Sequence, residues 1–295
     1  MEMIGIKQNN VTKVMSISII TNLFLSILKI VSGILFKSSA LLADGIHSLS
    51  DLTTDFFAII GGIMARKPAD LEHPYGHGKV EYLTGFIIGI IILGVGLTVI
   101  SSSTNNEIII PSTVVIVVSF ITIVLKYLLS NYIIKKGIKY NNNILIASGR
   151  ESKTDVISSF VVLISSILMQ FSNEIELLKY SDIIATIIVG IFIVHVGFSV
   201  IRENIDILLG KQETNKEYLD KINNLIINTE GIIKIKECII LKFGHVSNLS
   251  LTILMDKNLT LLEAHNIVDE LEKKIKEFDE QIVYMNTHME PFIKE

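Results

Sequence analysis

The stretch from Leu41 to Phe56, LLADGIHSLSDLTTDF, holds three aspartates and a histidine inside the most hydrophobic part of the chain. On a helix, residues three, four and seven positions apart share a face, so Asp44, His47 and Asp51 form one polar stripe. His47 and Asp51 are one turn apart, and this spacing lets an imidazole nitrogen and a carboxylate oxygen bind the same divalent cation. The alternative is a helix interface that is held by polar contacts.

A second pair of candidate ligands lies in the stretch IASGRESKTDVISSF, where Glu151 and Asp155 are again four residues apart. Two helices that each offer two ligands at this spacing can complete a four-coordinate site of one imidazole and up to three carboxylates. The alternative for Glu151 is a simple ion pair with Arg150 or Lys153 near the cytoplasmic end of its helix. The sequence therefore predicts a metal site between two apolar segments.

The composition places these polar groups in a membrane. The chain has 295 residues, of which 49% are hydrophobic and 19% charged, and its mean hydropathy is +0.54. The first two-thirds are therefore expected to be membrane-embedded. A charged group at membrane depth costs about 2.5–3.5 kcal/mol, so the stripe implies a partner, a wet cavity or a bound ion. The net charge of −4 gives no basic field for nucleic acid, and the single cysteine excludes an internal disulfide.

Apolar runs long enough to cross a bilayer need about 20 helical residues. We predict six of them, at residues 14–36, 40–64, 82–102, 112–134, 144–171 and 183–205. From about Gly210 the sequence becomes charged and amphipathic, which indicates a soluble domain of the remaining residues, so the expected domains are 1–209 and 210–295. In this tail we predict helix, strand, strand, helix and strand at 216–228, 235–243, 249–255, 260–278 and 282–288, with Thr260 and Glu263 forming a capping box.

The lysines and arginines collect in the N-terminal segment, in the second and fourth loops and after the last apolar run, whereas the odd-numbered loops hold only Lys37 and Lys179. Positively charged loops stay on the cytoplasmic side of a membrane. Both termini and the soluble domain are therefore expected to face the cytoplasm.

Five motifs together resemble the cation diffusion facilitator family. They are ADGIHSLSD at 43–51, HPYGHGKVE at 73–81, KTDVISS at 153–159, LTLLEAH at 259–265 and THMEP at 287–291. The resemblance covers nearly the whole chain. It implies a homodimeric transporter of six transmembrane helices in a bacterial-type plasma membrane, with a cytoplasmic ferredoxin-like α+β domain, that exports divalent metal from the cytoplasm in exchange for protons.

In the family, the transport site is built from two residues on the second helix and two on the fifth. Position by position these fall on His47, Asp51, Glu151 and Asp155. Glu151 departs from the pattern, because zinc-transporting relatives usually carry histidine there and several others carry aspartate. A more oxygen-rich site relaxes a strict zinc preference. We therefore expect zinc first and manganese or iron next, with cobalt and cadmium also considered.

The resemblance implies two further metal sites. Asp70, His73 and His77 match a family site in the second loop; the alternative is that they are merely solvated. In the tail, His265, His288 and Glu290 match positions that bind regulatory metal in some relatives. Thr252 stands there in place of a common histidine ligand, and His245 is a partial replacement. The alternative for the tail is ordinary surface histidines.

The expected function is that of a proton-coupled antiporter, not of an enzyme. Ligands must lose their protons to hold a metal, so protons and metal compete for one site and protons serve as the counter-substrate. The metal ion is the substrate, and no organic cofactor is expected. The chain lacks the His-Glu-x-x-His motif of a membrane metalloprotease and the phosphate-binding GxxxxGK[ST] loop. A membrane metal sensor or scaffold of the same fold that does not transport is the alternative.

Overall fold

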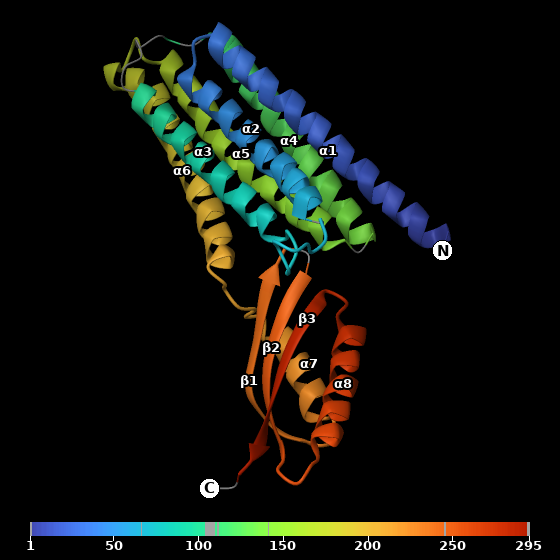
Figure 1. The fold of residues 1–295 in the computed structure, drawn as a ribbon. Helices are drawn as coiled ribbons and strands as arrows, with labels where there is room; N and C mark the ends of the chain where they lie inside the picture. Colours follow the sequence, from blue (N-terminus) through green and yellow to red (C-terminus); the bar gives the residue numbers. More distant parts are fainter. Residues whose placement is uncertain are drawn as a thin grey trace. The chain divides into compact units, whose positions relative to one another are not determined.

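The computed structural model describes residues 2–65, 67–103, 110, 112–140, 142–244 and 246–293. Its first part is helical, with α1 (Glu2–Leu35), α2 (Ser39–Ala65), α3 (Lys79–Ser103), α4 (Thr113–Tyr140), α5 (Asn143–Gln170), a short 3₁₀ helix η1 (Glu176–Tyr180) and α6 (Ser181–Leu208) (Figure 1). Its second part consists of α7 (Lys216–Ile227), β1 (Ile232–Phe243), β2 (Val246–Asp256), α8 (Leu261–Phe278) and β3 (Ile282–Phe292). The predicted fold class, a helical membrane domain followed by a small α+β domain, is confirmed.

The chain divides into two compact units by its internal contacts. One unit comprises Met1–Phe56 and Ile88–Ser199, and the other comprises Phe57–Ile87 and Val200–Glu295. The second unit therefore includes the end of α2, the loop that follows it, the start of α3 and the end of α6.

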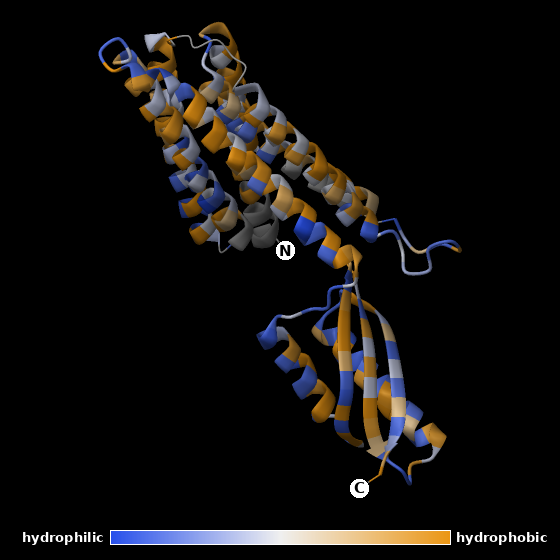
Figure 2. Cartoon of the chain, turned by 90° about the vertical axis from the view of Figure 1, so that its left-hand side faces the viewer, coloured by the Kyte–Doolittle hydropathy of each residue, from blue (hydrophilic) through white to orange (hydrophobic). Residues whose placement is uncertain are grey.

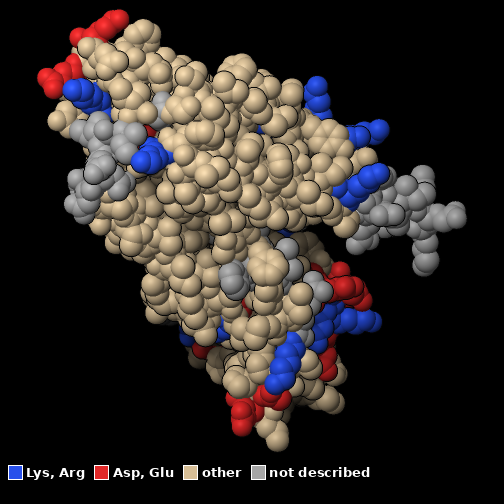
Figure 3. Space-filling view, turned by 90° about the horizontal axis from the view of Figure 1, so that it is seen from above, with Lys and Arg blue, Asp and Glu red and all other residues tan. Residues whose placement is uncertain are grey.

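Within the described residues, five helical segments are long and apolar enough to cross a membrane, at Val11–Leu35, Lys79–Ser103, Thr113–Tyr140, Leu145–Gln170 and Glu176–Leu208. Hydrophobic residues predominate along these helices (Figure 2), and few charged side chains interrupt the sides of the bundle in the face that Figure 3 shows. Such a surface suits lipid hydrocarbon. The remaining long helix, α2, has 27 residues and carries the polar stripe.

Small residues let α1 and α2 approach closely, as is common in membrane helix packing. A Cβ atom at Gly33 would lie 2.6 Å from the backbone nitrogen of Leu42, and one at Gly45 would lie 2.7 Å from Cγ1 of Ile30. Larger residues at either position would push the two helices apart. This close approach brings Asp44, the first residue of the polar stripe, against Lys29 of α1. α1 also packs on α4, which packs in turn on α5 (Figure 1).

In the second unit, the sheet has the strand order β1-β2-β3, with β1 and β2 antiparallel and β2 and β3 parallel. Buried and more accessible residues alternate along β2, as expected for a strand with one covered face. Both helices pack on this sheet, α7 against β1 and α8 against β3. Their fully buried contacts include Ile222, Ile226, Leu249, Leu251, Leu271 and Ile275. These layers form the predicted α+β domain.

The capping box at the start of α8 is confirmed. The hydroxyl of Thr260 accepts a hydrogen bond from the backbone N–H of Glu263 at 3.3 Å, and the carboxylate of Glu263 accepts one from the backbone N–H of Thr260 at 2.8 Å. Two otherwise unpaired backbone donors are thereby satisfied. The local sequence therefore determines where this helix begins.

Candidate metal centre

Three of the predicted transport ligands lie together inside the helical unit. His47 and Asp51 of α2 and Asp155 of α5 each place a ligand atom within 4.8 Å of the others. The His47 side chain is buried, whereas those of Asp51 and Asp155 are 20% and 14% exposed. One imidazole and two carboxylates from two neighbouring helices can bind one divalent cation. The one-turn spacing on α2 therefore places both of its candidate ligands beside α5.

The imidazole of His47 carries a buried polar atom without a hydrogen-bond partner among the described residues. This atom is Nδ1, and it lies 4.0 Å from Oδ1 of Asp51, which is too far for a hydrogen bond. A buried polar atom that forms no hydrogen bond is costly in a protein interior. A cation placed between His47 and the two aspartates would satisfy it.

Two buried lysines lie beside this group, and neither was predicted from the sequence as part of the site. Lys126 Nζ of α4 is 3.0 Å from Oδ2 of Asp155, and Lys29 Nζ of α1 is 2.8 Å from Oδ2 of Asp44. The signal that could have found them is a single lysine in the middle of an otherwise apolar run, since such residues almost always face a partner inside a membrane bundle.

Asp44, the first member of the predicted stripe, is engaged by this ion pair and by two serines of α5. Ser158 donates a hydrogen bond to its Oδ1 at 2.7 Å, and Ser159 donates one to its Oδ2 at 2.8 Å. The Ser-Ser pair of the KTDVISS motif therefore holds α5 against α2. Asp44 joins the helices and lies outside the group of three candidate ligands.

Glu151, the fourth predicted ligand, lies one turn before Asp155 on α5 with an exposed side chain. Its carboxylate is not among the atoms that lie within 4.8 Å of one another in the His47 group. The structure thus brings three of the four predicted ligands together. The participation of Glu151 stays a prediction.

The loop between α2 and α3 places its three predicted ligands around one carboxylate. Asp70 Oδ1 lies 3.2 Å from Nδ1 of His73, and Asp70 Oδ2 lies 3.4 Å from Nε2 of His77. The backbone N–H of His73, 2.8 Å from Oδ1, and the ammonium of Lys67 hold the pKa of Asp70 down at about 2. The carboxylate is therefore ionised at neutral pH. Two imidazoles and one carboxylate at these distances can bind a divalent cation in place of their mutual contacts.

Aromatic residues attach this loop to the sheet within the second unit. The ring of Tyr75 lies 5.7 Å from that of Phe243 and 5.2 Å from that of Tyr284, measured between centroids. Lys79 Nζ lies 4.8 Å from the centroid of Phe243. A side chain at Gly78 would collide with the backbone of Phe243, so glycine permits this approach. The loop that carries the three candidate ligands is therefore in direct contact with β1 and β3.

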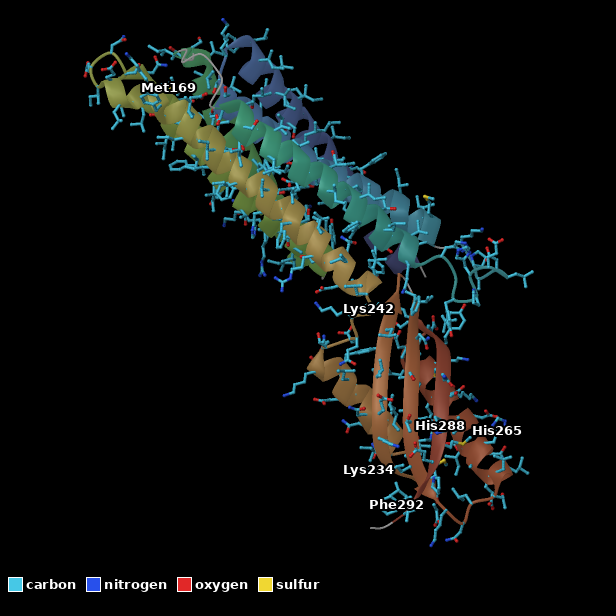
Figure 4. The ribbon with its side chains drawn as sticks, turned by 60° about the vertical axis from the view of Figure 1, so that its left-hand side comes forward. Met169, Lys234, Lys242, His265, His288 and Phe292 are labelled. Carbon is cyan, nitrogen blue, oxygen red and sulfur yellow. The ribbon has the colours of Figure 1, made fainter. Side chains whose placement is uncertain are left out.

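Among the described residues, the predicted ligands of the α+β domain form no comparable group. His265 lies on α8 and His288 on β3 (Figure 4), and their Nε2 atoms pair with Asp269 at 3.6 Å and Glu290 at 3.7 Å. Glu290 also accepts two hydrogen bonds of 2.8 Å from Lys236. His245 lies outside the described residues. Within the part of the chain that the structure describes, the two clusters of candidate ligands are the His47 and Asp70 groups, so the metal site of the α+β domain stays a prediction.

Two family models match the chain. The cation efflux transmembrane domain matches residues 15–209, and the cytoplasmic domain of cation efflux proteins matches residues 214–292. Together they cover both the helical part and the α+β part of the structure.

Several relatives match along most of their length. An uncharacterized transporter of Methanocaldococcus jannaschii is 33% identical over 87% of this chain and 90% of that protein. The manganese efflux system protein MneP of Bacillus subtilis is 30% identical over 96% of this chain and 97% of that protein. A cadmium, cobalt and zinc/H(+)-K(+) antiporter of the same bacterium is 28% identical over 90% of this chain and 85% of that protein. The chain therefore belongs to the cation diffusion facilitator family of metal transporters.

Proposed function

We propose that this integral membrane protein exports a divalent transition-metal cation from the cytoplasm in exchange for protons, and that the ion binds at His47, Asp51 and Asp155. The observation that carries this proposal is the convergence of one imidazole and two carboxylates from α2 and α5 inside an apolar helix bundle. Ionisable groups at membrane depth are expensive and typically mark an ion pathway. A sensor or scaffold has no need for ligands at that depth.

We propose manganese as the substrate. The sequence alone ranked zinc first, but the three grouped donors offer one nitrogen and two carboxylates, and Glu151 would add a third carboxylate. Carboxylate oxygens suit manganese, whereas softer sets richer in nitrogen or sulfur suit zinc. The relative MneP is a manganese efflux system protein, which agrees with this donor set. Zinc, iron, cobalt and cadmium are the competing candidates.

Proton coupling follows from the chemistry of the donors. A carboxylate or an imidazole nitrogen that holds a proton cannot bind a metal through the same atom. Arrival of the ion therefore releases protons, and departure of the ion leaves sites that protons can occupy. We infer that protons are the counter-substrate and that no organic cofactor takes part.

The remaining assignments complete the proposed transporter. Residues 1–209 form the transport domain and residues 210–295 a regulatory domain through which two chains form a homodimer. Both termini face the cytoplasm of a bacterial-type cell. The Asp70 group guides cytoplasmic metal or couples metal binding to the α+β domain, and the set of His245, His265, His288 and Glu290 is the weaker regulatory site.

The test is metal uptake into everted membrane vesicles under an imposed pH gradient, with manganese, zinc, iron, cobalt and cadmium measured separately. We expect manganese uptake to depend on the pH gradient and to stop when a protonophore dissipates the gradient. Uptake that is independent of the pH gradient would contradict proton coupling. The absence of uptake for all five metals by correctly inserted protein would favour the sensor or scaffold.

The Asp51→Ala variant identifies the site. We expect it to insert normally, as judged by its amount in purified membranes, and to lose transport because the ion loses a carboxylate ligand from α2. Leu71→Ala is the matched control, since Leu71 is fully exposed in the loop. Wild-type flux through Asp51→Ala would refute the assignment of the site.

A further inference from the structure

Lys126 is a buried cation whose carboxylate partner is itself a proposed metal ligand. Its Nζ atom lies 3.0 Å from Oδ2 of Asp155 and 3.4 Å from Oγ of Ser48, and its side chain is 4% exposed. The ammonium therefore lies beside the group of three candidate ligands and forms an ion pair with one of them, Asp155.

The second buried lysine differs in the partner that it holds. Lys29 pairs with Asp44 at 2.8 Å and donates hydrogen bonds to Ser159 at 2.8 Å and Ser48 at 3.2 Å. Asp44 is not one of the grouped ligands, so the Lys29–Asp44 pair is able to persist whether or not a metal is present. The Lys126–Asp155 pair, by contrast, competes with the ion, because its carboxylate is also one of the proposed metal ligands.

We propose that Lys126 is a tethered competitor of the transported metal: its ammonium holds Asp155 in the empty site, yields the carboxylate to the arriving ion, and returns when the ion leaves. This inference rests on the proposed function of the His47, Asp51 and Asp155 group. In this role Lys126 sets how tightly the site binds the metal and how readily the metal leaves, although Lys126 is not itself a ligand.

The arrangement offers the lysine a second position. Lysine is a point charge on a flexible four-carbon stem, so its ammonium can shift by a few ångströms without movement of α4. Ser48 Oγ already lies within 3.4 Å and accepts a hydrogen bond from Lys126, so this contact can remain when Asp155 turns to the ion. Two cations near one carboxylate repel each other strongly in a medium of low dielectric constant. That repulsion limits how tightly the site holds the metal and favours release.

The test compares Lys126→Met with the wild-type full-length chain. If Lys126 competes with the ion, its removal should lower the Kd for Mn²⁺ by about tenfold or more, because the bound ion loses a neighbouring positive charge. Equilibrium binding is measured on purified protein in which Asp70→Ala and His73→Ala silence the loop site. In vesicles that contain the loop ligands, both KM and the maximal rate of Mn²⁺ uptake should fall, since a more tightly held ion leaves more slowly.

Two further variants separate charge from shape and folding. Lys126→Arg keeps the positive charge and should keep the Kd for Mn²⁺ within a few-fold of the wild-type value. Lys126→Met, in contrast, should lower this Kd by about tenfold or more. Lys126→Gln keeps N–H donors but loses the charge, so it should bind Mn²⁺ more tightly, and it replaces Lys126→Met if that variant fails to insert. A lysine that only stabilises the bundle predicts the opposite direction, weaker binding after its removal.

An unchanged or higher Kd for Mn²⁺ in the inserted Lys126→Gln or Lys126→Met protein would overturn this inference. Asp51→Ala distinguishes this failure from a failure of the transport site. If Asp51→Ala abolishes transport while the neutral Lys126 variants bind Mn²⁺ like the wild type, the site stands and the competitor role is wrong. If Asp51→Ala transports normally, the site itself is wrong and the inference falls with it.

Discussion

Lys29 of α1 and Asp44 of α2 form an ion pair of 2.8 Å between side chains that are each 1% exposed. Ser159 of α5 contacts both partners, since its hydroxyl accepts from Lys29 and lies 2.8 Å from Oδ2 of Asp44. Three helices thus meet at one charged contact. The contact positions α2, which carries His47 and Asp51, against α5, which carries Asp155.

Removal of one partner from this pair should destabilise the helical unit. In Lys29→Met the carboxylate of Asp44 stays buried without its cation, which typically costs about 3–5 kcal/mol. We expect a clear fall in the thermal unfolding midpoint of the purified protein in detergent, measured by the loss of monodisperse material during heating. The double variant Lys29→Met/Asp44→Leu should recover part of this loss, because it leaves no buried charge behind.

The exposed pair between Lys211 and Asp206 is the matched control. These side chains are 2.9 Å apart but are 54% and 37% exposed. Because solvent-exposed pairs contribute about 0–1 kcal/mol, Lys211→Met should change the midpoint little. Equal midpoints for Lys29→Met and Lys211→Met would show that the buried pair does not hold the helices together.

Exchange of Glu151 for histidine should move selectivity toward zinc. The substitution would offer a nitrogen donor one turn before Asp155, and nitrogen-rich sets suit zinc better than manganese. The measurement is competition between Zn²⁺ and Mn²⁺ for uptake into everted vesicles. Glu151→Asp is the control, because it keeps an oxygen donor and should keep the wild-type preference. Identical competition curves for the histidine variant and the wild type would remove Glu151 from the ligand set.

Loss of the Tyr75 ring should loosen the loop that carries Asp70, His73 and His77. Each aromatic pair contributes about 0.5–1.5 kcal/mol, and Tyr75 forms two such pairs with residues of the sheet. We therefore expect faster amide hydrogen exchange over residues 67–78 in Tyr75→Ala. Leu71→Ala removes a fully exposed side chain from the same loop and should leave exchange unchanged. Unaltered exchange in Tyr75→Ala would mean that other contacts attach the loop.

The sequence predicted the architecture well because its signals are local and strong. Runs of about 20 apolar residues predict membrane helices by length alone, and the Thr260–Glu263 box marks the first turn of α8. The one-turn spacing of His47 and Asp51 placed both on one face of α2, and the structure brings that face to Asp155. These features depend on periodicity within one segment.

The parts that the sequence left open depend on how helices are packed against each other. Lys29 and Lys126 each stand alone in an apolar run, and nothing within α1 or α4 shows that their partners are Asp44 and Asp155. The side-chain direction of Glu151 depends likewise on the rotation of α5 about its axis. Tertiary packing decides such contacts, and neither periodicity nor motif spacing carries that information.

We expect His47, Asp51 and Asp155 to share one transported ion. The decisive measurement is anomalous scattering from crystals of the full-length protein soaked with Mn²⁺, with data collected at the manganese absorption edge. The anomalous map should show a peak within coordination distance of all three side chains in the wild type, and this peak should be lost in Asp51→Ala. Manganese at the Asp70 loop with no peak between α2 and α5 would mean that these three residues do not form the transport site.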